Sequence, residues 1–296
     1  MTPFFILYQF ENYLTSEKRF SVHTVTSYKT DLKQFVEFIE ITNEEGLKEV
    51  NHQLVRSWIV NLIDDGMSNR SVNRKLSTLR AFFRWLLKQG FIEHNPLLKI
   101  KGPKSEKRLP TFMKESELDE NKLDVLFTND FEGVRDRLMI EFFYQTGIRL
   151  SELISLKEND VTETTIKILG KRNKERIIPI TKGLHINILN FQRLKSAFKI
   201  NSECFFTLIN GENLYPKLVY RKINYYLGLV SSLEKKSPHI LRHTFATHML
   251  NNGAGLETLK DILGHANLSA TQVYTHSSFT QLNNIYSQSH PRGRKK

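Results

Sequence analysis

Apolar residues in the first hundred positions recur every three or four residues, which is the spacing of one face of an amphipathic α-helix. The pattern is clearest over residues 24–39, 53–65 and 68–88. Ser68 is a suitable N-cap for the last of these helices, and Gly90 is a suitable stop. The sequence therefore predicts that this part of the chain is a block of helices.

The helix predicted over residues 68–88 has two contrasting faces. Its apolar stripe consists of Val72, Leu76, Leu79, Phe82, Phe83, Leu86 and Leu87. Its opposite face carries the four cations Arg70, Arg74, Arg84 and Lys88, and no Asp or Glu interrupts the helix. A merely solvated basic face does not require that exclusion, so contact with DNA phosphates is the favoured interpretation and simple solvation the alternative.

A basic linker is expected after this block. Residues 99–110 (KIKGPKSEKRLP) are rich in Lys and broken by Gly102, Pro103 and Pro110, a composition typical of an extended segment between domains. We therefore expect two domains, residues 1–104 and residues 105–296.

The second part of the chain has a mixed pattern. Helical spacing over residues 134–144 is followed by strand-like alternation at residues 164–169 and again at 177–180. The turn between the two strands is rich in cations, and Lys171, Arg172, Lys174 and Arg176 are expected at or near its tip. The predicted fold class is mainly α, with a small β-hairpin in the C-terminal domain.

Residues 237–276 contain the candidate chemistry. Serine followed by proline at 237–238 predicts a helix start, which places His239 and Arg242 on one face of the first turn beside free backbone N–H groups. His265 directly follows Gly264, and Tyr274 lies on a third short helix. Each residue alone is more often a cap, an ion-pair partner or a half-buried aromatic. Together they form a candidate phosphate site, because a tyrosine hydroxyl becomes a useful nucleophile only where cations stabilise the developing charge.

Composition narrows the class of partner. The chain has 43 Lys and Arg against 31 Asp and Glu, a net charge of +12. That balance favours a nucleic acid over an indifferent basic surface. The single cysteine, Cys204, excludes an intrachain disulfide and fits a reducing cytoplasm.

The sequence also lacks several other signatures. We find no phosphate-binding GxxxxGK[ST] loop and no carboxylate cluster for a two-metal site. No run approaches the ~20 apolar residues of a membrane span. The short apolar start has no basic lead-in and does not resemble a signal peptide.

Five segments, in this order, resemble the boxes of the tyrosine recombinases (phage integrase family), most closely the Xer-type members. These are residues 146–153 (TGIRLSEL), 170–176 (GKRNKER), 239–243 (HILRH), 263–265 (LGH) and 274–276 (YTH). The closing residues 286–292 (YSQSHPR) are also similar to the Xer-type ending. The resemblance covers nearly the whole chain.

The resemblance implies a set of catalytic roles. Tyr274 would attack a DNA phosphate, form a 3′-phosphotyrosyl link and free a 5′-hydroxyl. The bond energy would be kept in that link, so the resemblance implies that neither ATP nor a metal cofactor is needed. Arg149 and Arg242 would clamp the non-bridging oxygens, while His239 and His265 would hydrogen-bond the phosphate or assist proton movement.

A lysine of the hairpin would supply the proton for the leaving 5′-oxygen. Lys171 stands at the family's position for this general acid. Arg172 stands where the family often has glycine, so the turn can differ in shape and Lys174 remains an alternative. Glu152 would orient its neighbours instead of reacting.

The resemblance also implies an architecture. Residues 1–104 would form a SAM-like core-binding domain, and with the catalytic domain, 105–296, they would make a C-shaped clamp around duplex DNA. Residues 279–288 resemble a C-terminal helix that docks on a neighbouring subunit, with Leu282, Ile285 and Tyr286 spaced for that contact.

The expected function is site-specific recombination of double-stranded DNA in the cytoplasm, by a homo- or hetero-tetramer with a related recombinase on two sites. Resolution of chromosome dimers at cell division is the favoured role, with a septal DNA translocase as an additional candidate partner. A mobile-element integrase or invertase is the alternative. A type IB topoisomerase and a non-catalytic DNA-binding protein are less favoured.

Overall fold

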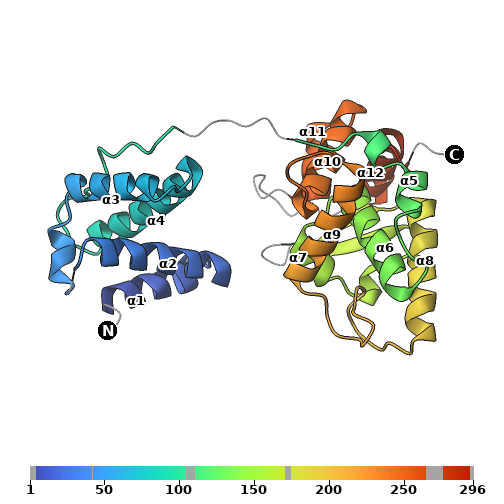
Figure 1. The fold of residues 1–296 in the computed structure, drawn as a ribbon, viewed down its shortest axis with the longest axis horizontal. Coiled ribbons are helices and arrows are strands. Elements are labelled where there is room, and N and C mark those ends of the chain that lie inside the picture. The colour runs from blue at the N-terminus through green and yellow to red at the C-terminus, as the bar shows by residue number, and fades with distance from the viewer. Residues whose placement is uncertain (1–4, 42, 105–110, 171–174, 265–275, 294–296) are drawn as a thin grey trace. The chain divides into compact units, whose positions relative to one another are not determined.

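The computed structural model describes residues 5–41, 43–104, 111–170, 175–264 and 276–293, with only the backbone described over 276–281. The chain divides into two compact units, residues 1–108 and 109–296 (Figure 1). The boundary expected from the linker, between residues 104 and 105, adjoins a stretch outside the described residues.

The N-terminal unit is helical, as its periodicity predicts. Its α-helices are α1 (Phe5–Asn12), α2 (Val22–Phe38), α3 (His52–Asp64) and α4 (Asn69–Lys88), and a π-helical turn (Tyr13–Glu17) and a 3-10 turn (Glu45–Lys48) join them. Ser68 caps α4 as expected, since its hydroxyl accepts a hydrogen bond from the backbone N–H of Ser71.

Aromatic side chains fill the core of this unit. The rings of Phe10 and Phe82 lie 5.1 Å apart and those of Phe35 and Trp58 lie 5.0 Å apart, both edge to face. The apolar stripe predicted for α4 is buried from Val72 to Leu86. Leu87 was expected on that stripe but is 40% exposed, because it falls at the edge of the buried arc.

In its described residues the C-terminal unit is mainly helical with one antiparallel hairpin, which confirms the predicted fold class. Its hairpin pairs β1 (Thr165–Leu169) with β2 (Glu175–Pro179), in a register that sets Ile168 opposite Arg176. Its helices are α5 (Glu120–Asp124), α6 (Phe131–Thr146), α7 (Leu150–Ile154), α8 (Lys182–Ala197), α9 (Pro216–Val230), α10 (Pro238–Asn251), α11 (Leu256–Leu263) and α12 (His276–Ser289), with 3-10 turns at Glu115–Glu117 and Glu158–Asp160. The hairpin tip, 171–174, lies outside the described residues.

Helix α6 is the central element of this unit. It is buried along most of its length and contacts α8, α9 and α10, which surround it in Figure 1. Gly147 ends it in the left-handed conformation with φ +60°. A Cβ at that position would lie 2.5 Å from the ring of Phe245 on α10. Only glycine therefore permits the close approach that brings the end of α6 against α10.

The segment that enters this unit is fastened to α10. The backbone N–H of Met113 donates to the Thr244 hydroxyl over 3.0 Å, and the Met113 carbonyl lies 2.9 Å from Nε2 of His248. Nδ1 of His248 in turn lies 3.1 Å from the Tyr144 hydroxyl. Burial lowers the pKa of His248, so a neutral ring can serve both bonds, and α10 is held to α6 on this side.

The C-terminal segment packs within its own unit. Leu282 and Tyr286 of α12 are 6% and 1% exposed in the same core as α6 and α10, and Ile285 packs against that core. The Tyr286 hydroxyl donates to the Gln145 carbonyl over 3.0 Å. The sequence assigned these three residues to a neighbouring subunit, whereas the single chain covers them itself.

A buried ion network extends this packing. Arg292 donates to Glu141 over 3.0 Å and to the Leu118 carbonyl over 2.6 Å, and Arg137 also pairs with Glu141. Burial by itself would raise the pKa of Glu141, but the guanidinium groups of Arg137 and Arg292 lower it to about 2. The chain end is thereby tied to the middle of α6.

Truncation of Tyr286 tests whether α12 belongs to this fold. We expect Tyr286→Ala to lower the free energy of unfolding of the C-terminal unit by about 3–5 kcal/mol, because it empties a buried aromatic site and removes a hydrogen bond. Hydrogen exchange of α6 amides in rising denaturant measures the free energy of unfolding of this unit. Trp58 and Trp85, the chain's two tryptophans, report the N-terminal unit by fluorescence. Tyr220→Ala, at a 48% exposed site, is the control; equal effects of the two variants would contradict the packing.

Acidification tests the Glu141 network. The folded pKa of about 2 lies below the ordinary 4.5, so the unfolded chain takes up this proton first as the pH falls. Glu141 therefore contributes stability above about pH 4.5 that is lost as the pH falls toward 2. In the same exchange experiment between pH 3 and 7, Glu141→Gln should be less stable at pH 7 and should lose stability with acid less steeply, by about one proton. Glu203→Gln, with a side chain 85% exposed, is the control; parallel curves for Glu141→Gln and the unmodified protein would refute the network.

Candidate active site

Arg149 is the N-cap residue of α7, and Glu152 in the first turn of that helix holds it in place. The backbone N–H of Arg149 donates to Oε2 of Glu152 and its Nη1 donates to Oε1, both over 2.7 Å. Its Nη2 donates to the Gly264 carbonyl over 3.2 Å. The side chain remains 28% exposed. Arg149 is thus held in one orientation with part of its guanidinium open to a ligand.

Arg242 projects from the first turns of α10 toward the end of α11, where Arg149 also binds. Its guanidinium donates to the Gly147 carbonyl and, over 2.7 Å, to the Leu263 carbonyl. Burial and the nearby charge of Arg149 lower the pKa of Arg242 to about 10. The group is still protonated at neutral pH, and an arriving anion would relieve the repulsion between the two arginines.

The carbonyls that hold the arginines come from two glycine turns. Gly147 ends α6 and Gly264 ends α11, both in the left-handed conformation. Such an end leaves carbonyl groups without a helical partner, and the arginine side chains supply the missing donors. The local sequence TGIR and the Leu263–Gly264 end of α11 therefore supply the carbonyls that hold Arg149 beside Arg242.

Arg176 is a third arginine of this cluster, and the sequence did not assign it. It was expected at or near the hairpin tip. The structure places it second in β2, close to that tip, and it is only 4% exposed. Its two Nη atoms donate to Glu152 over 3.0 and 2.7 Å, and its Nε donates to the Ile262 carbonyl over 2.7 Å. The alternation of Arg176 and Ile178 was the available signal, since both positions face inward.

Glu152 is the acceptor shared by two arginines. Burial by itself would raise its pKa, but hydrogen bonds and charge from Arg176, and then Arg149, lower the value to about 2. The carboxylate is therefore ionised at any physiological pH. It orients the arginines, as the sequence predicted, and it has no proton to give.

The remaining predicted residues divide into two groups. His239 lies exposed on the first turn of α10, one turn before Arg242. Lys171, Lys174, His265 and Tyr274 lie outside the described residues. In sequence, Lys171 follows β1 by two positions, His265 directly follows Gly264, and Tyr274 precedes α12 by two positions.

The basic face of α4 has two kinds of member. Arg70, Arg84 and Lys88 are exposed, as predicted. Arg74 is 53% exposed, but its two Nη atoms bind the buried carboxylate of Asp31. Burial raises the pKa of Asp31, but hydrogen bonds from Arg74, Lys75 and Thr78 bring it below its usual value. Arg74 therefore has a structural role in this unit whether or not it also meets a phosphate.

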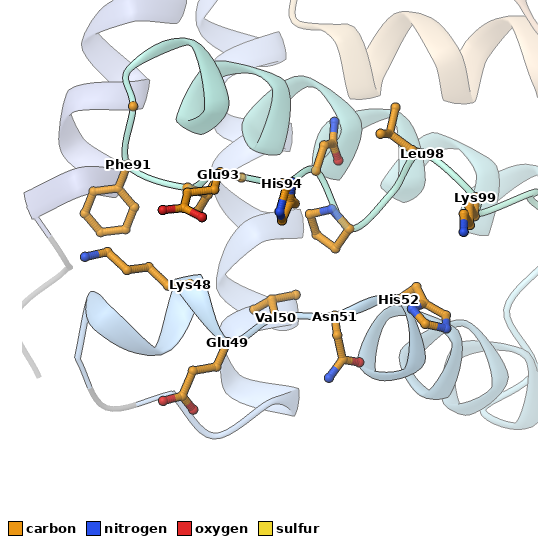
Figure 2. A pocket seen from close by; sticks show the side chains of 14 residues that line it. Lys48, Glu49, Val50, Asn51, His52, Phe91, Glu93, His94, Leu98 and Lys99 are labelled. Carbon is orange, nitrogen blue, oxygen red and sulfur yellow. The ribbon is translucent and has the colours of Figure 1, made fainter.

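A surface pocket of about 660 Å³ lies elsewhere in the N-terminal unit. Figure 2 shows Lys48, Glu49, Phe91, Glu93 and His94 around it, from the segments before α3 and after α4. Cations, carboxylates and the phenyl ring of Phe91 mix in its lining, so no single ligand chemistry is favoured.

Two other kinds of feature are absent from the described ranges. No three His, Cys, Asp or Glu side chains are grouped there to hold a metal ion, and none of the helices there combines the length and the apolar character of a membrane span.

Comparison with known proteins agrees with this arrangement. Residues 116–281 match the model of the phage integrase family, and residues 7–90 match the phage integrase N-terminal SAM-like domain. A protein of Chlorobaculum tepidum named tyrosine recombinase XerC is 37% identical, over 96% of this chain and 94% of its own length.

Two solved structures share the fold. The first is the XerH site-specific recombinase bound to palindromic difH substrate in a post-cleavage complex. It matches with a TM-score of 0.71 and 24% identity, over 95% of this chain and 84% of that one. The second is a lambda integrase tetramer bound to a Holliday junction, with a TM-score of 0.66 and 18% identity, over 91% and 80% of the two chains. The chain belongs to the phage integrase family of tyrosine recombinases.

Proposed function

We propose that this protein is a site-specific recombinase that cleaves and rejoins DNA strands through a tyrosyl intermediate. The observation that carries the proposal is the pair Arg149 and Arg242. The two guanidinium groups are held side by side by carbonyls of the same turn, at Gly264 and Leu263. Two cations held so close together repel each other. A phosphate that accepts hydrogen bonds from both guanidinium groups offsets that repulsion, which makes it the ligand that fits the pair best.

The pair suits the transition state of phosphoryl transfer. When the Tyr274 oxygen attacks the phosphorus, negative charge grows on the two non-bridging oxygens. Planar guanidinium groups that are already oriented stabilise that charge without reorganising. The arginines would therefore favour the transition state over the ground-state diester, which is what lowers the barrier.

The proposed step conserves the phosphodiester energy. The Tyr274 oxygen bonds to phosphorus while the bond to the 5′-oxygen breaks, and Lys171 gives that oxygen its proton, with Lys174 as the alternative. The tyrosine proton passes to solvent or to a histidine, His239 or His265. A 5′-hydroxyl then attacks the phosphotyrosine in the reverse sense and rejoins the strand. Neither ATP nor a metal enters the balance. Tyr274, both lysines and His265 are assigned by their motif positions.

The proposal gives the two domains different roles on the DNA. Residues 1–104 would bind the core site, through Arg70, Arg84 and Lys88 on α4, and residues 105–296 would cut it. A clamp of both domains around duplex DNA agrees with the net charge of +12. The lambda integrase tetramer supports assembly of subunits on DNA, with a sister recombinase as the further proposal.

Chromosome dimer resolution at cell division, in the cytoplasm, is the biological role we favour. It is supported by whole-length similarity to a relative named XerC, and a septal DNA translocase is the proposed additional partner. The similarity in fold to lambda integrase keeps a mobile-element role as the second candidate. Immunoprecipitation of the protein with its bound host DNA, followed by sequencing, separates them. Enrichment at one locus near the replication terminus supports the first role, and enrichment at a mobile element supports the second.

The nucleophile is tested on the DNA site recovered in that way. With a nicked duplex that traps the intermediate, the unmodified protein should become linked to the 3′ end, and Tyr274→Phe should form no detectable adduct while still binding the duplex. Tyr8→Phe, at a 55% exposed tyrosine of α1, should react normally. An adduct with Tyr274→Phe would show that another residue attacks, and binding without any adduct in the unmodified protein would favour a mere DNA-binding protein.

The basic face of α4 is tested by salt dependence. If Arg84 meets a phosphate, Arg84→Ala should weaken binding of the same duplex and reduce the slope of log K against log salt by about 0.9. Fluorescence anisotropy between 50 and 200 mM salt measures both. Arg56→Ala removes an exposed cation from α3 and is the matched control. Equal slopes for the two variants would argue that the α4 face is only solvated. Arg74→Ala is a poorer probe, because it also strips Asp31 of a partner.

A further inference from the structure

We propose that Arg176 is a positioning residue of the active site, one that holds the end of α11 and the Arg149–Glu152 pair in the single arrangement in which both phosphate-binding arginines meet one phosphate. The inference rests on the function proposed for Arg149 and Arg242. Arg176 itself is 4% exposed and need not touch DNA.

Three successive carbonyls at the end of α11 each accept from a different arginine. Ile262 accepts from Arg176 over 2.7 Å, Leu263 from Arg242 over 2.7 Å, and Gly264 from Arg149 over 3.2 Å. The last carbonyls of a helix lack helical donors and carry the negative end of its dipole. A cation on each is therefore favourable, and the first, from Arg176, is the most deeply buried.

Arg176 also packs against the turn that follows. Gly264 has φ +64°, and a Cβ added there would lie 3.3 Å from both Cδ and Nη1 of Arg176. The aliphatic and guanidinium parts of Arg176 thus pack directly against Gly264. Since His265 is the next residue in the chain, the anchor of Arg176 lies three positions before a predicted phosphate ligand.

The charges give Arg176 a second task. Arg149, Arg242 and Arg176 surround one carboxylate, Glu152, so the cluster has a net charge of +2. Without Arg176, the carboxylate would pair with Arg149 alone, and Arg242 would be the single uncompensated cation. Arg176 therefore shares Glu152 and leaves more of the charge of Arg149 for a phosphate.

Stability alone is a weak reason to bury this ion pair. Taking both charges out of water costs about as much as their attraction returns, and apolar replacements of similar volume are often tolerated. The fixed geometry is what an apolar residue could not reproduce. A displacement of about 1 Å in the phosphate-binding groups can reduce a reaction rate about 100-fold.

The test compares two buried arginines of the same unit. Arg135 is 1% exposed, pairs with Asp136 and donates to the Thr207 carbonyl over 3.4 Å, and it lies near the opposite end of α6 from Arg149. Arg176→Gln and Arg135→Gln should both lower the unfolding temperature. On a nicked duplex carrying the recovered site, at saturating DNA, only Arg176→Gln should slow formation of the covalent adduct, by about 100-fold per folded molecule, with DNA affinity within about threefold.

Two further variants keep the outcome decisive. Arg176→Lys restores the charge but not the three-bond geometry, so it should recover part of the rate and remain about tenfold slow; it carries the test if Arg176→Gln does not fold. Adduct formation by Arg176→Gln at the rate of Arg135→Gln would overturn the inference.

Arg242→Ala, measured in parallel, distinguishes a failure of this inference from a failure of the proposed active site. If Arg242→Ala is inactive and Arg176→Gln is active, only the role of Arg176 is refuted. If Arg242→Ala is also active, the proposed site itself is wrong.

Discussion

The end of α11 is the constraint on which the site depends. A helix that stops inside a protein must find donors for its last carbonyls, and here Arg176, Arg242 and Arg149 provide them in succession. These arginines come from β2, from α10 and from the turn after α6, so one short helix end sets the relative positions of three distant segments. Glu152 completes the cluster by accepting from two of the arginines. The phosphate-binding groups are thus oriented before any DNA arrives.

The surrounding fold keeps that cluster rigid. Gly147 allows α6 to end against Phe245 of α10, so that Arg149 emerges beside Arg242. On the side of α6 bound by the C-terminal segment, Tyr286 donates to the Gln145 carbonyl, and Arg292 binds Glu141 one turn earlier. The last turns of α6 are therefore held by the chain end as well as by the core. Catalytic groups mounted on such a buried scaffold keep their geometry better than groups carried on loops.

The sequence correctly predicted those elements that have a periodic apolar pattern and those residues that belong to a motif. Periodicity predicted the helices of α2 and α4 because their buried faces are continuous, and the boxes predicted that Arg149 and Arg242 belong to one site. Contacts between distant residues that no motif marks were missed. The partner of Arg74, Asp31, lies 43 positions away, and the burial of Arg176 was hidden by the cations beside it. Leu282 and Tyr286 looked like docking residues because nothing in their spacing shows which core covers them.

The central claim is that Arg149 and Arg242 act together on one phosphate. A double-mutant cycle tests it most directly: the rate of covalent adduct formation is measured for Arg149→Ala, Arg242→Ala and the double variant, on the protein's own recombination site at saturating DNA. Groups that act as a unit give strongly non-additive losses. We predict that each single variant loses nearly as much rate as the double variant. Independent losses that multiply in the double variant would contradict the account.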